Sequence, residues 1–287
     1  MRAPAVFALL SLALLSGCGA FSGGGGGGRL YQVRGHDLYL HCTGKGSPTV
    51  VLEAGLGDDS TMWDGILAQA GTIGTRVCAY DRLGLGQSDR TGKMRTLDEV
   101  ARDLHGLVVA AEVERPFVLA AHSMGGLIDR AYAKRYPKDV AGLVLVDSVP
   151  DDWDHYVGYG FFAGAGEQLD IRDASASLRS SDTLGSKPVV VLRAAADTTV
   201  LSTLRAADPG RKWSDFQAYW TAAQRKLATI STNALYAVAT RSDHDVPHAR
   251  PALTAAAIRL AVESARTRRP LPTCARSGLR AQGASCR

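Results

Sequence analysis

A serine at the end of an apolar segment is the clearest chemical signal in this sequence. Ser123 lies just beyond the apolar run Phe117–Ala121, and the small residues Ala121 and Gly125 stand two positions before and after it. This spacing is typical of a nucleophile elbow, a tight strand–turn–helix in which small neighbours let the serine oxygen project from the sheet edge. We therefore expect Ser123 to be a nucleophile, and the Met124 N–H to donate to an oxyanion.

A serine hydroxyl is a weak nucleophile at neutral pH and needs a histidine base, whose ring is in turn oriented by a carboxylate. Of the seven histidines, only His244 and His248 lie beyond the elbow and outside a segment that we interpret as a lid. We favour His244, because it comes soon after the apolar run Ala234–Ala239. Asp147 and Asp197 follow two other apolar runs and are the candidate acids.

The elements that must position these residues alternate along the chain. Continuous apolar runs are typical of strands buried on both faces, and we predict strands at Leu38–Cys42, Thr49–Glu53, Arg76–Tyr80, Pro116–Ala121, Gly142–Val146, Val189–Leu192 and Ala234–Ala239. Helical patterns lie between or after them, at Thr96–Val113, Gly126–Tyr136, Trp213–Ile230 and Pro251–Arg266. This order predicts an α/β fold with a mostly parallel central sheet flanked by helices.

Two further turns give the chain a family resemblance. Residues 50–57 contain Glu53-Ala54-Gly55 and are followed later by Tyr80–Asp89, a second glycine-rich turn after a strand. Together with the elbow and the histidine, they make the segment from about Val33 to Arg266 resemble an α/β-hydrolase fold enzyme. The first turn resembles the oxyanion loop of that family, although many members have His-Gly where this chain has Glu-Ala-Gly.

The resemblance implies roles for particular residues. It makes the Leu56 N–H the second oxyanion donor, and it places His244 where the family carries its base. Asp197 matches the family's usual acid, and Asp147 is the alternative because some members take the acid from the preceding strand. It also implies a small lid insertion after the sixth strand of the family's sheet, at about residues 150–187.

The predicted substrate pocket is aromatic. Trp153, Phe161 and Phe162 lie in the predicted lid, and Trp63 lies in the helix expected after the oxyanion loop. These side chains favour a small to medium apolar acyl or alcohol group. The predicted activity is cofactor-free cleavage of an ester-like bond in a small molecule through an acyl-enzyme. Amide, lactone and carbon–carbon bond hydrolysis use the same machinery, and a catalytically silent binding protein of the same fold is the alternative from another class.

Metal and nucleotide motifs do not support a different chemistry. The sequence contains no HExxH or CxxC spacing, and its glycine run lacks the lysine and preceding strand of a phosphate loop. We therefore expect neither a metal nor a cofactor. The net charge of +5 is a mild excess, and we expect no nucleic-acid partner. The oligomeric state stays open.

The first residues have the pattern of an export signal. Arg2 precedes an apolar run, Ala3–Leu15, that is shorter than the ~20 residues of a membrane span. The ending Leu15-Ser16-Gly17-Cys18 resembles the lipobox of bacterial lipoproteins. We thus expect a signal peptide at 1–17, a lipid on Cys18 and a glycine-rich tether at 18–28. The protein would be exported and anchored through this lipid to the outer face of the bacterial cytoplasmic membrane, or secreted if the signal is an ordinary one.

The remaining chain is predicted to form one catalytic domain at 29–270 and a basic, cysteine-containing tail at 271–287. If Cys18 carries a lipid, four cysteines remain, and exported proteins commonly pair theirs. Cys274 and Cys286 close a short interval in the tail and are expected to pair. Cys42 and Cys78 would then form the second disulfide, which the family topology permits because their strands are neighbours. Two buried free thiols are the alternative.

Overall fold

The computed structural model describes residues 27–286 except 159–160, 165, 173–177, 179–183, 197, 208 and 211. The predicted signal peptide, Cys18 and most of the predicted tether lie outside these residues. In the described part, the main sheet has the strand order β1-β2-β4-β3-β6-β7-β10-β11-β12. Its strands are β1 (Arg29–Val33), β2 (His36–Thr43), β3 (Val50–Glu53), β4 (Val77–Tyr80), β6 (Phe117–His122), β7 (Val140–Val146), β10 (Val189–Ala194), β11 (Ala234–Ala239) and β12 (Ala284–Ser285).

The centre of this sheet is parallel, as predicted. Strands β4, β3, β6, β7, β10 and β11 pair in parallel, whereas β1 with β2, β2 with β4, and β11 with β12 pair antiparallel. All seven predicted strands are present, with ends that differ by at most two residues. Because the central strands run in one direction, their carboxyl ends lie along one edge, where ligands bind in folds of this kind.

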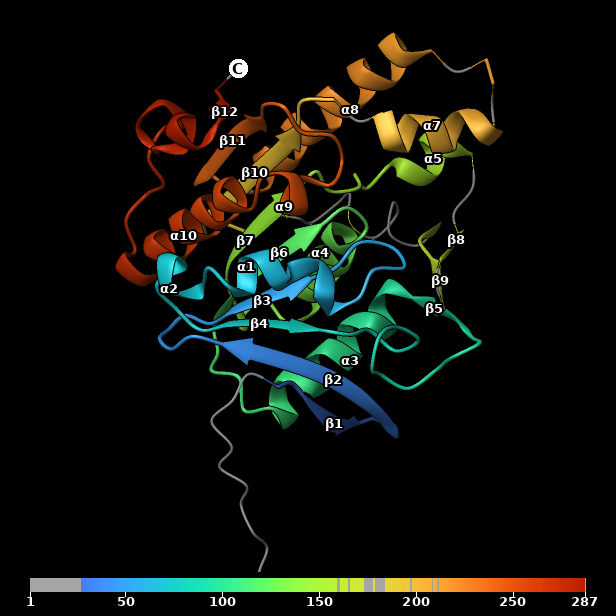
Figure 1. Ribbon diagram of the computed structural model, residues 1–287, viewed down its shortest axis with the longest axis vertical. Helices are drawn as coiled ribbons and strands as arrows, with labels where there is room; N and C mark the ends of the chain where they lie inside the picture. Colours follow the sequence, from blue (N-terminus) through green and yellow to red (C-terminus); the bar gives the residue numbers. More distant parts are fainter. Residues whose placement is uncertain are drawn as a thin grey trace, which may run out of the picture.

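Helices cover both faces of the sheet (Figure 1). They are α1 (Asp64–Leu67), α2 (Ala70–Ile73), α3 (Leu97–Ala110), α4 (Gly125–Arg135), α5 (Trp153–Val157), α7 (Thr198–Ala207), α8 (Trp213–Leu227), α9 (Val246–Ala249) and α10 (Pro251–Thr267). The four predicted helices correspond to α3, α4, α8 and α10. Thr96 caps α3 with a capping box that includes Glu99, which satisfies N–H groups that the first helical turn leaves unpaired.

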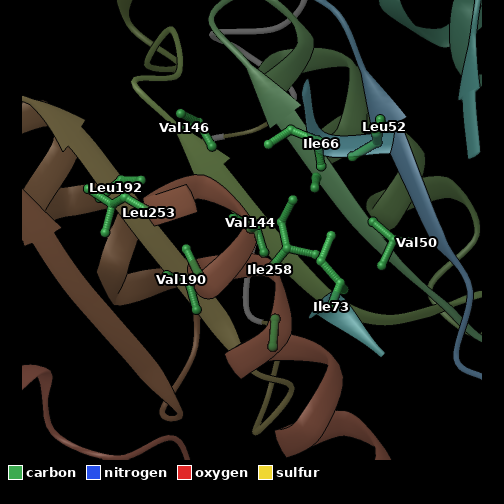
Figure 2. Close-up of a cluster of buried hydrophobic side chains, with 14 of the residues drawn as sticks. Val50, Leu52, Ile66, Ile73, Val144, Val146, Val190, Leu192, Leu253 and Ile258 are labelled. Atoms are coloured by element: carbon green, nitrogen blue, oxygen red, sulfur yellow. The ribbon is translucent and has the colours of Figure 1, made fainter. Parts of the chain in front are cut away.

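Two hydrophobic layers sandwich the sheet. Val50 and Leu52 of β3 face a cluster that includes α1, α2 and α10, and Figure 2 shows labelled side chains of this cluster from both the strands and the helices. Val51 points the other way, into a cluster with α3 and α4. Successive strand residues alternate between the faces, so a continuous apolar run serves both layers. This explains why the strands carry little polar alternation.

A second, small sheet was not predicted. It joins β5 (Met94–Thr96), β9 (Glu167–Asp170) and β8 (Phe161–Gly164) in that order. β8 and β9 belong to the segment that we predicted as a lid, together with α5, while the rest of that segment is described only in part. The insertion is thus held against the loop before α3 by strand pairing.

Both predicted disulfides are present. Cys42 of β2 and Cys78 of β4 face each other directly in the register of the two strands and are bonded. Cys274 and Cys286 are bonded as well. We predicted residues 271–287 as a separate tail, but β12 extends the sheet next to β11 and Leu279 is fully buried in the core. The tail therefore belongs structurally to the domain.

Candidate active site

Ser123 occupies a tight turn between β6 and α4. Its φ is +53°, in the left-handed region that non-glycine residues rarely adopt. A Cβ atom on Gly125 would lie 2.7 Å from the Ala54 carbonyl oxygen, and one on Gly126 would lie 2.4 Å from Ser148 Cβ. The elbow therefore requires glycine at both positions, because the turn packs directly against the loop after β3 and the segment after β7.

Ser123, His244 and Asp147 form one hydrogen-bonded chain. Ser123 Oγ lies 2.8 Å from His244 Nε2, and His244 Nδ1 lies 2.8 Å from Asp147 Oδ2. A carboxylate only accepts hydrogen bonds, so Nδ1 carries the proton and Nε2 is free to accept the serine proton. Asp147 is fully buried, whereas the His244 side chain keeps 13% of its surface exposed. His244 can thus contact a substrate, whereas Asp147 is shielded from solvent.

The described carboxylate beside His244 belongs to Asp147, the candidate acid that we had placed second. The sequence favoured Asp197 and kept Asp147 as the alternative; among the described residues, His244 Nδ1 donates to Asp147. Asp197 itself lies outside the described residues. Register explains the position of Asp147: His122 of β6 pairs with Val146 of β7, so serine and aspartate each follow the last paired residue of adjacent strands. The other carboxylate oxygen of Asp147 accepts from Ala194 N and from Trp220 Nε1, both at 2.9 Å.

The loop that carries His244 is held by His122 and by its own Asp243. His122 Nε2 donates to the His244 carbonyl oxygen at 2.9 Å, and the His244 N–H donates to Asp243 Oδ1 at 2.7 Å. Burial, together with the neighbouring His244, lowers the pKa of His122 to about 4, so His122 is neutral near pH 7. His248, the alternative base, is exposed and pairs with Asp245. The structure therefore brings His244, and not His248, to Ser123.

The two predicted oxyanion donors lie beside the serine. Met124 directly follows Ser123 and precedes the first residue of α4. Gly55, next to Leu56, lies so close that a Cβ on it would be 3.5 Å from Ser123 Cβ. Among the described residues, neither the Leu56 N–H nor the Met124 N–H donates to a protein acceptor. Both are therefore available to an oxygen bound at the serine.

A buried charge cluster supports the Leu56 loop and was not predicted. Arg82, which is 2% exposed, contacts the carboxylates of Glu53 and Glu167. Burial raises the pKa of Glu53 although Arg82 and Tyr80 oppose this shift. Burial also raises the pKa of Asp129 far above its usual range, with Glu53 adding to the effect. This shift favours the neutral form of Asp129, which adds no third negative charge to the buried cluster.

The predicted pocket residues lie in different parts of the structure. Trp153 and Phe162 join a hydrophobic cluster that also includes Met124 and Leu56, so they lie on the side of the sheet edge that carries the elbow. Trp63 is wrong as a pocket residue: it has no exposed surface and packs in the core beneath α10. Its short helix turns the indole inward together with Met62, while Thr61 and Asp64 are exposed. The side chain of Phe161 lies outside the description.

Two further features were checked against the described residues, a metal-binding cluster and a membrane-spanning helix. No group of three or more histidine, cysteine or acidic side chains in that part of the chain is arranged to hold a metal ion. A search of the same residues finds no helix with the length and apolar content to cross a membrane. The residues missed by sequence reasoning are Arg82, Glu167 and Trp220, and Glu53 was recognised only as part of the oxyanion loop. Of these, only Glu53 carries a sequence signal, a charged residue at the end of a continuous apolar run.

The sheet order, the elbow and the site at the carboxyl edge define an α/β-hydrolase fold. The model of the family described as serine aminopeptidase, S33, matches residues 45–159. The uncharacterized protein YqjL of Bacillus subtilis is 33% identical over 112 residues, which cover 39% of this chain and 44% of that protein. The chain thus matches less than half the length of this relative.

Solved structures extend the likeness over most of the domain. A thermophilic esterase from Thermogutta terrifontis, with malate bound, has a TM-score of 0.61 at 19% identity, covering 83% of this chain and 99% of the esterase. A meta-cleavage product hydrolase from Pseudomonas fluorescens has a TM-score of 0.59 at 19% identity, covering 84% and 98%. At these identities the likeness establishes the α/β-hydrolase fold. The reaction has to be inferred from the geometry of the site.

Proposed function

We propose that this protein is a serine hydrolase that cleaves an ester-like bond through an acyl-enzyme on Ser123. The observation that carries the proposal is the hydrogen-bonded chain from Ser123 through His244 to Asp147, with both distances at 2.8 Å. This geometry suits proton transfer from a nucleophile to a base whose tautomer is fixed by a carboxylate. The strained backbone at Ser123 adds support, because strain of this kind clusters at functional sites.

Acylation begins when Ser123 Oγ attacks the substrate carbonyl carbon and His244 Nε2 takes the hydroxyl proton. The carbonyl oxygen becomes an oxyanion, which the Leu56 and Met124 N–H groups stabilise. Each such donor contributes about 10²- to 10³-fold to the rate in enzymes of this type. Collapse of the intermediate breaks the bond to the alcohol, which leaves with the proton held on His244. Asp147 stabilises the imidazolium while it exists.

Deacylation repeats these steps with water. His244 Nε2 takes a proton from the water, whose oxygen attacks the acyl carbon. The second oxyanion occupies the same two N–H groups and then collapses, releasing the acid and returning the proton to Ser123 Oγ. The chain's own residues supply every proton transfer in this cycle, so the proposed reaction needs no cofactor.

The proposed substrate carries a small to medium apolar group. This rests on the partly buried side chains of Leu56 and Phe162, which pack against the hydrophobic cluster that contains Met124, because apolar surface next to the oxyanion donors favours an apolar acyl or alcohol part. Amide hydrolysis is the second candidate, and the match to the serine aminopeptidase model favours it. Esters come first because their leaving alcohol requires less assistance than an amine.

Labelling with a fluorophosphonate tests the proposal. Wild-type protein should lose p-nitrophenyl ester turnover as one label enters at Ser123, and Ser123→Ala should neither turn over the ester nor take the label. A folded wild-type protein that remains unlabelled would favour the silent binding protein instead. A panel of acyl chain lengths, with matched amides and lactones, then assigns the bond and the size of the acyl group.

Export and lipid attachment at Cys18 are part of the proposal. They rest on the apolar run at Ala3–Leu15 and on the lipobox-like residues before Cys18. A lipid chain anchors a protein by burying methylene groups, at about 0.8 kcal/mol for each. In a bacterial host, wild-type protein should enter the membrane fraction and incorporate labelled fatty acid, whereas Cys18→Ala should do neither. Fatty-acid labelling of Cys18→Ala equal to that of wild type would contradict the proposal.

A further inference from the structure

Arg82 uses its whole guanidinium to connect the loop after β3 with the insertion. Nη1 donates to Ala54 O at 2.8 Å and to Glu53, and Nη2 donates to Gly55 O at 2.6 Å and to Glu167. Nε donates to the second oxygen of Glu167 at 2.8 Å. All five N–H groups thus have acceptors, which fixes the side chain in one orientation.

These contacts also fix the direction of the Leu56 N–H. The Gly55 carbonyl and the Leu56 N–H belong to one planar trans peptide group, so they point in opposite directions. Because Arg82 binds the Gly55 oxygen, the Leu56 N–H must point away from Arg82. The next peptide group is held as well, since the Gly57 N–H donates to Glu167 Oε1 at 2.9 Å. Arg82 and Glu167 therefore anchor the peptide groups on both sides of Leu56.

Glu167 is itself placed by close backbone packing. It is the first residue of β9, and the preceding Gly166 meets Gly84 of the loop after β4. A Cβ on either glycine would lie 2.4 Å from the carbonyl oxygen of the other, and both have positive φ, +103° at Gly84 and +115° at Gly166. Only glycine permits this approach. The Glu167 carboxylate, 3% exposed, is thereby carried from the insertion into the interior.

We propose that Glu167 is a positioning residue for the oxyanion site: through Arg82 and the Gly57 N–H, it holds the Leu56 N–H in the direction that an oxyanion requires. This inference rests on the proposed function, since it concerns the same oxyanion. It assigns a catalytic consequence to the insertion, because β9 supplies the carboxylate that orders a loop more than a hundred residues earlier in the chain. Glu167 acts on the geometry of the donor and does not touch the substrate.

The variants Glu167→Ala and Glu167→Gln remove different numbers of the Glu167 contacts. Alanine removes all three contacts of the carboxylate. Glutamine keeps an oxygen for the Gly57 N–H and Arg82 Nη2, but its amide NH₂ then faces the Arg82 Nε–H, donor against donor. The matched control is Asp170→Asn in the same strand, because the Asp170 carboxylate pairs with Arg172 near the surface and accepts its hydrogen bonds from Arg172 rather than from the loop after β3.

The readouts separate positioning from general stability. We expect kcat for a p-nitrophenyl ester to fall about 10- to 100-fold in Glu167→Ala, a fraction of the ~10²- to 10³-fold loss when a donor is deleted. The fall should be smaller in Glu167→Gln and absent in Asp170→Asn, with KM changed less than about threefold throughout. A trifluoromethyl ketone, whose adduct with Ser123 places an oxyanion at the same N–H groups, should lose affinity in parallel with kcat.

Several results would overturn the inference. Wild-type kcat in both Glu167 variants would refute the positioning role while leaving the proposed function intact, and so would a rise in KM at constant kcat. An equal loss in Asp170→Asn would mean that β9 acts only through stability. If Glu167→Ala fails to fold, Glu167→Gln decides alone, because it conserves shape. A wild-type protein without Ser123-dependent turnover would refute the proposed function and this inference together.

Discussion

Replacing Asp147 by asparagine should reverse the tautomer of the proposed base. Asp147 Oδ1 accepts two N–H groups, from Ala194 and from Trp220, while Oδ2 accepts one from His244. Asparagine has a single oxygen, and the two N–H donors select it for the Oδ1 position. The amide NH₂ group then faces His244 Nδ1 and donates to it, which moves the ring proton to Nε2. A protonated Nε2 cannot accept the proton of Ser123.

The expected loss in kcat is about 10³- to 10⁴-fold, as for wrong-tautomer variants of serine hydrolases. At 1.36 kcal/mol for each factor of ten, this corresponds to about 4–5.5 kcal/mol of transition-state stabilisation. The assay is steady-state turnover of a p-nitrophenyl ester by purified protein whose thermal unfolding matches wild type. Asp197→Asn is the comparison, because the sequence favoured that residue. More turnover in Asp147→Asn than in Asp197→Asn would refute the tautomer argument and restore the sequence assignment.

Two further predictions concern the stability of the fold. His122 has a pKa of about 4 in the folded protein against 6.5 when free, so the unfolded chain binds a proton first as the pH falls. His122→Gln should therefore abolish about 2–3 kcal/mol of the stability that is lost between about pH 7 and pH 4. Urea unfolding at each pH measures this loss, and an unchanged pH dependence would contradict the prediction. Cys274→Ser should lower the free energy of unfolding by about 3 kcal/mol, since the disulfide closes a 12-residue interval. Cys286→Ser should lower it by the same amount. Unequal losses would show that one cysteine side chain contributes to stability apart from the disulfide.

The sequence could predict what depends on local pattern. The elbow can be recognised because a tight turn requires small residues at fixed positions around Ser123. The central strands can be recognised because their apolar runs are long and uninterrupted. The Cys274–Cys286 pairing follows from short separation in the chain. Each of these features is determined within about a dozen residues, so spacing alone carries the information.

The missed features depend on contacts between distant segments. Glu167 and Arg82 are 85 residues apart, and nothing near either residue indicates the other. β5, β8 and β9 are too short to be predicted by their own preferences and exist because they pair with one another. The choice of Asp147 depends on which carboxylate lies beside the imidazole once β6, β7 and β11 are aligned. Both aspartates follow strands, so the pattern could not distinguish them.

The two ends of the proposed catalytic apparatus are held by segments outside the parallel sheet. On the acid side, the Trp220 indole of α8 binds Asp147 and leaves its other oxygen for His244. On the oxyanion side, Glu167 of β9 binds Arg82 and the Gly57 N–H. β9 and α8 both lie between β7 and β11 in the chain. Trp153 of the same region packs edge-on against Trp220, and Leu56 and Phe162 pack against the same buried cluster. Substitutions that change this cluster should therefore alter the substrate preference and the rate of turnover together.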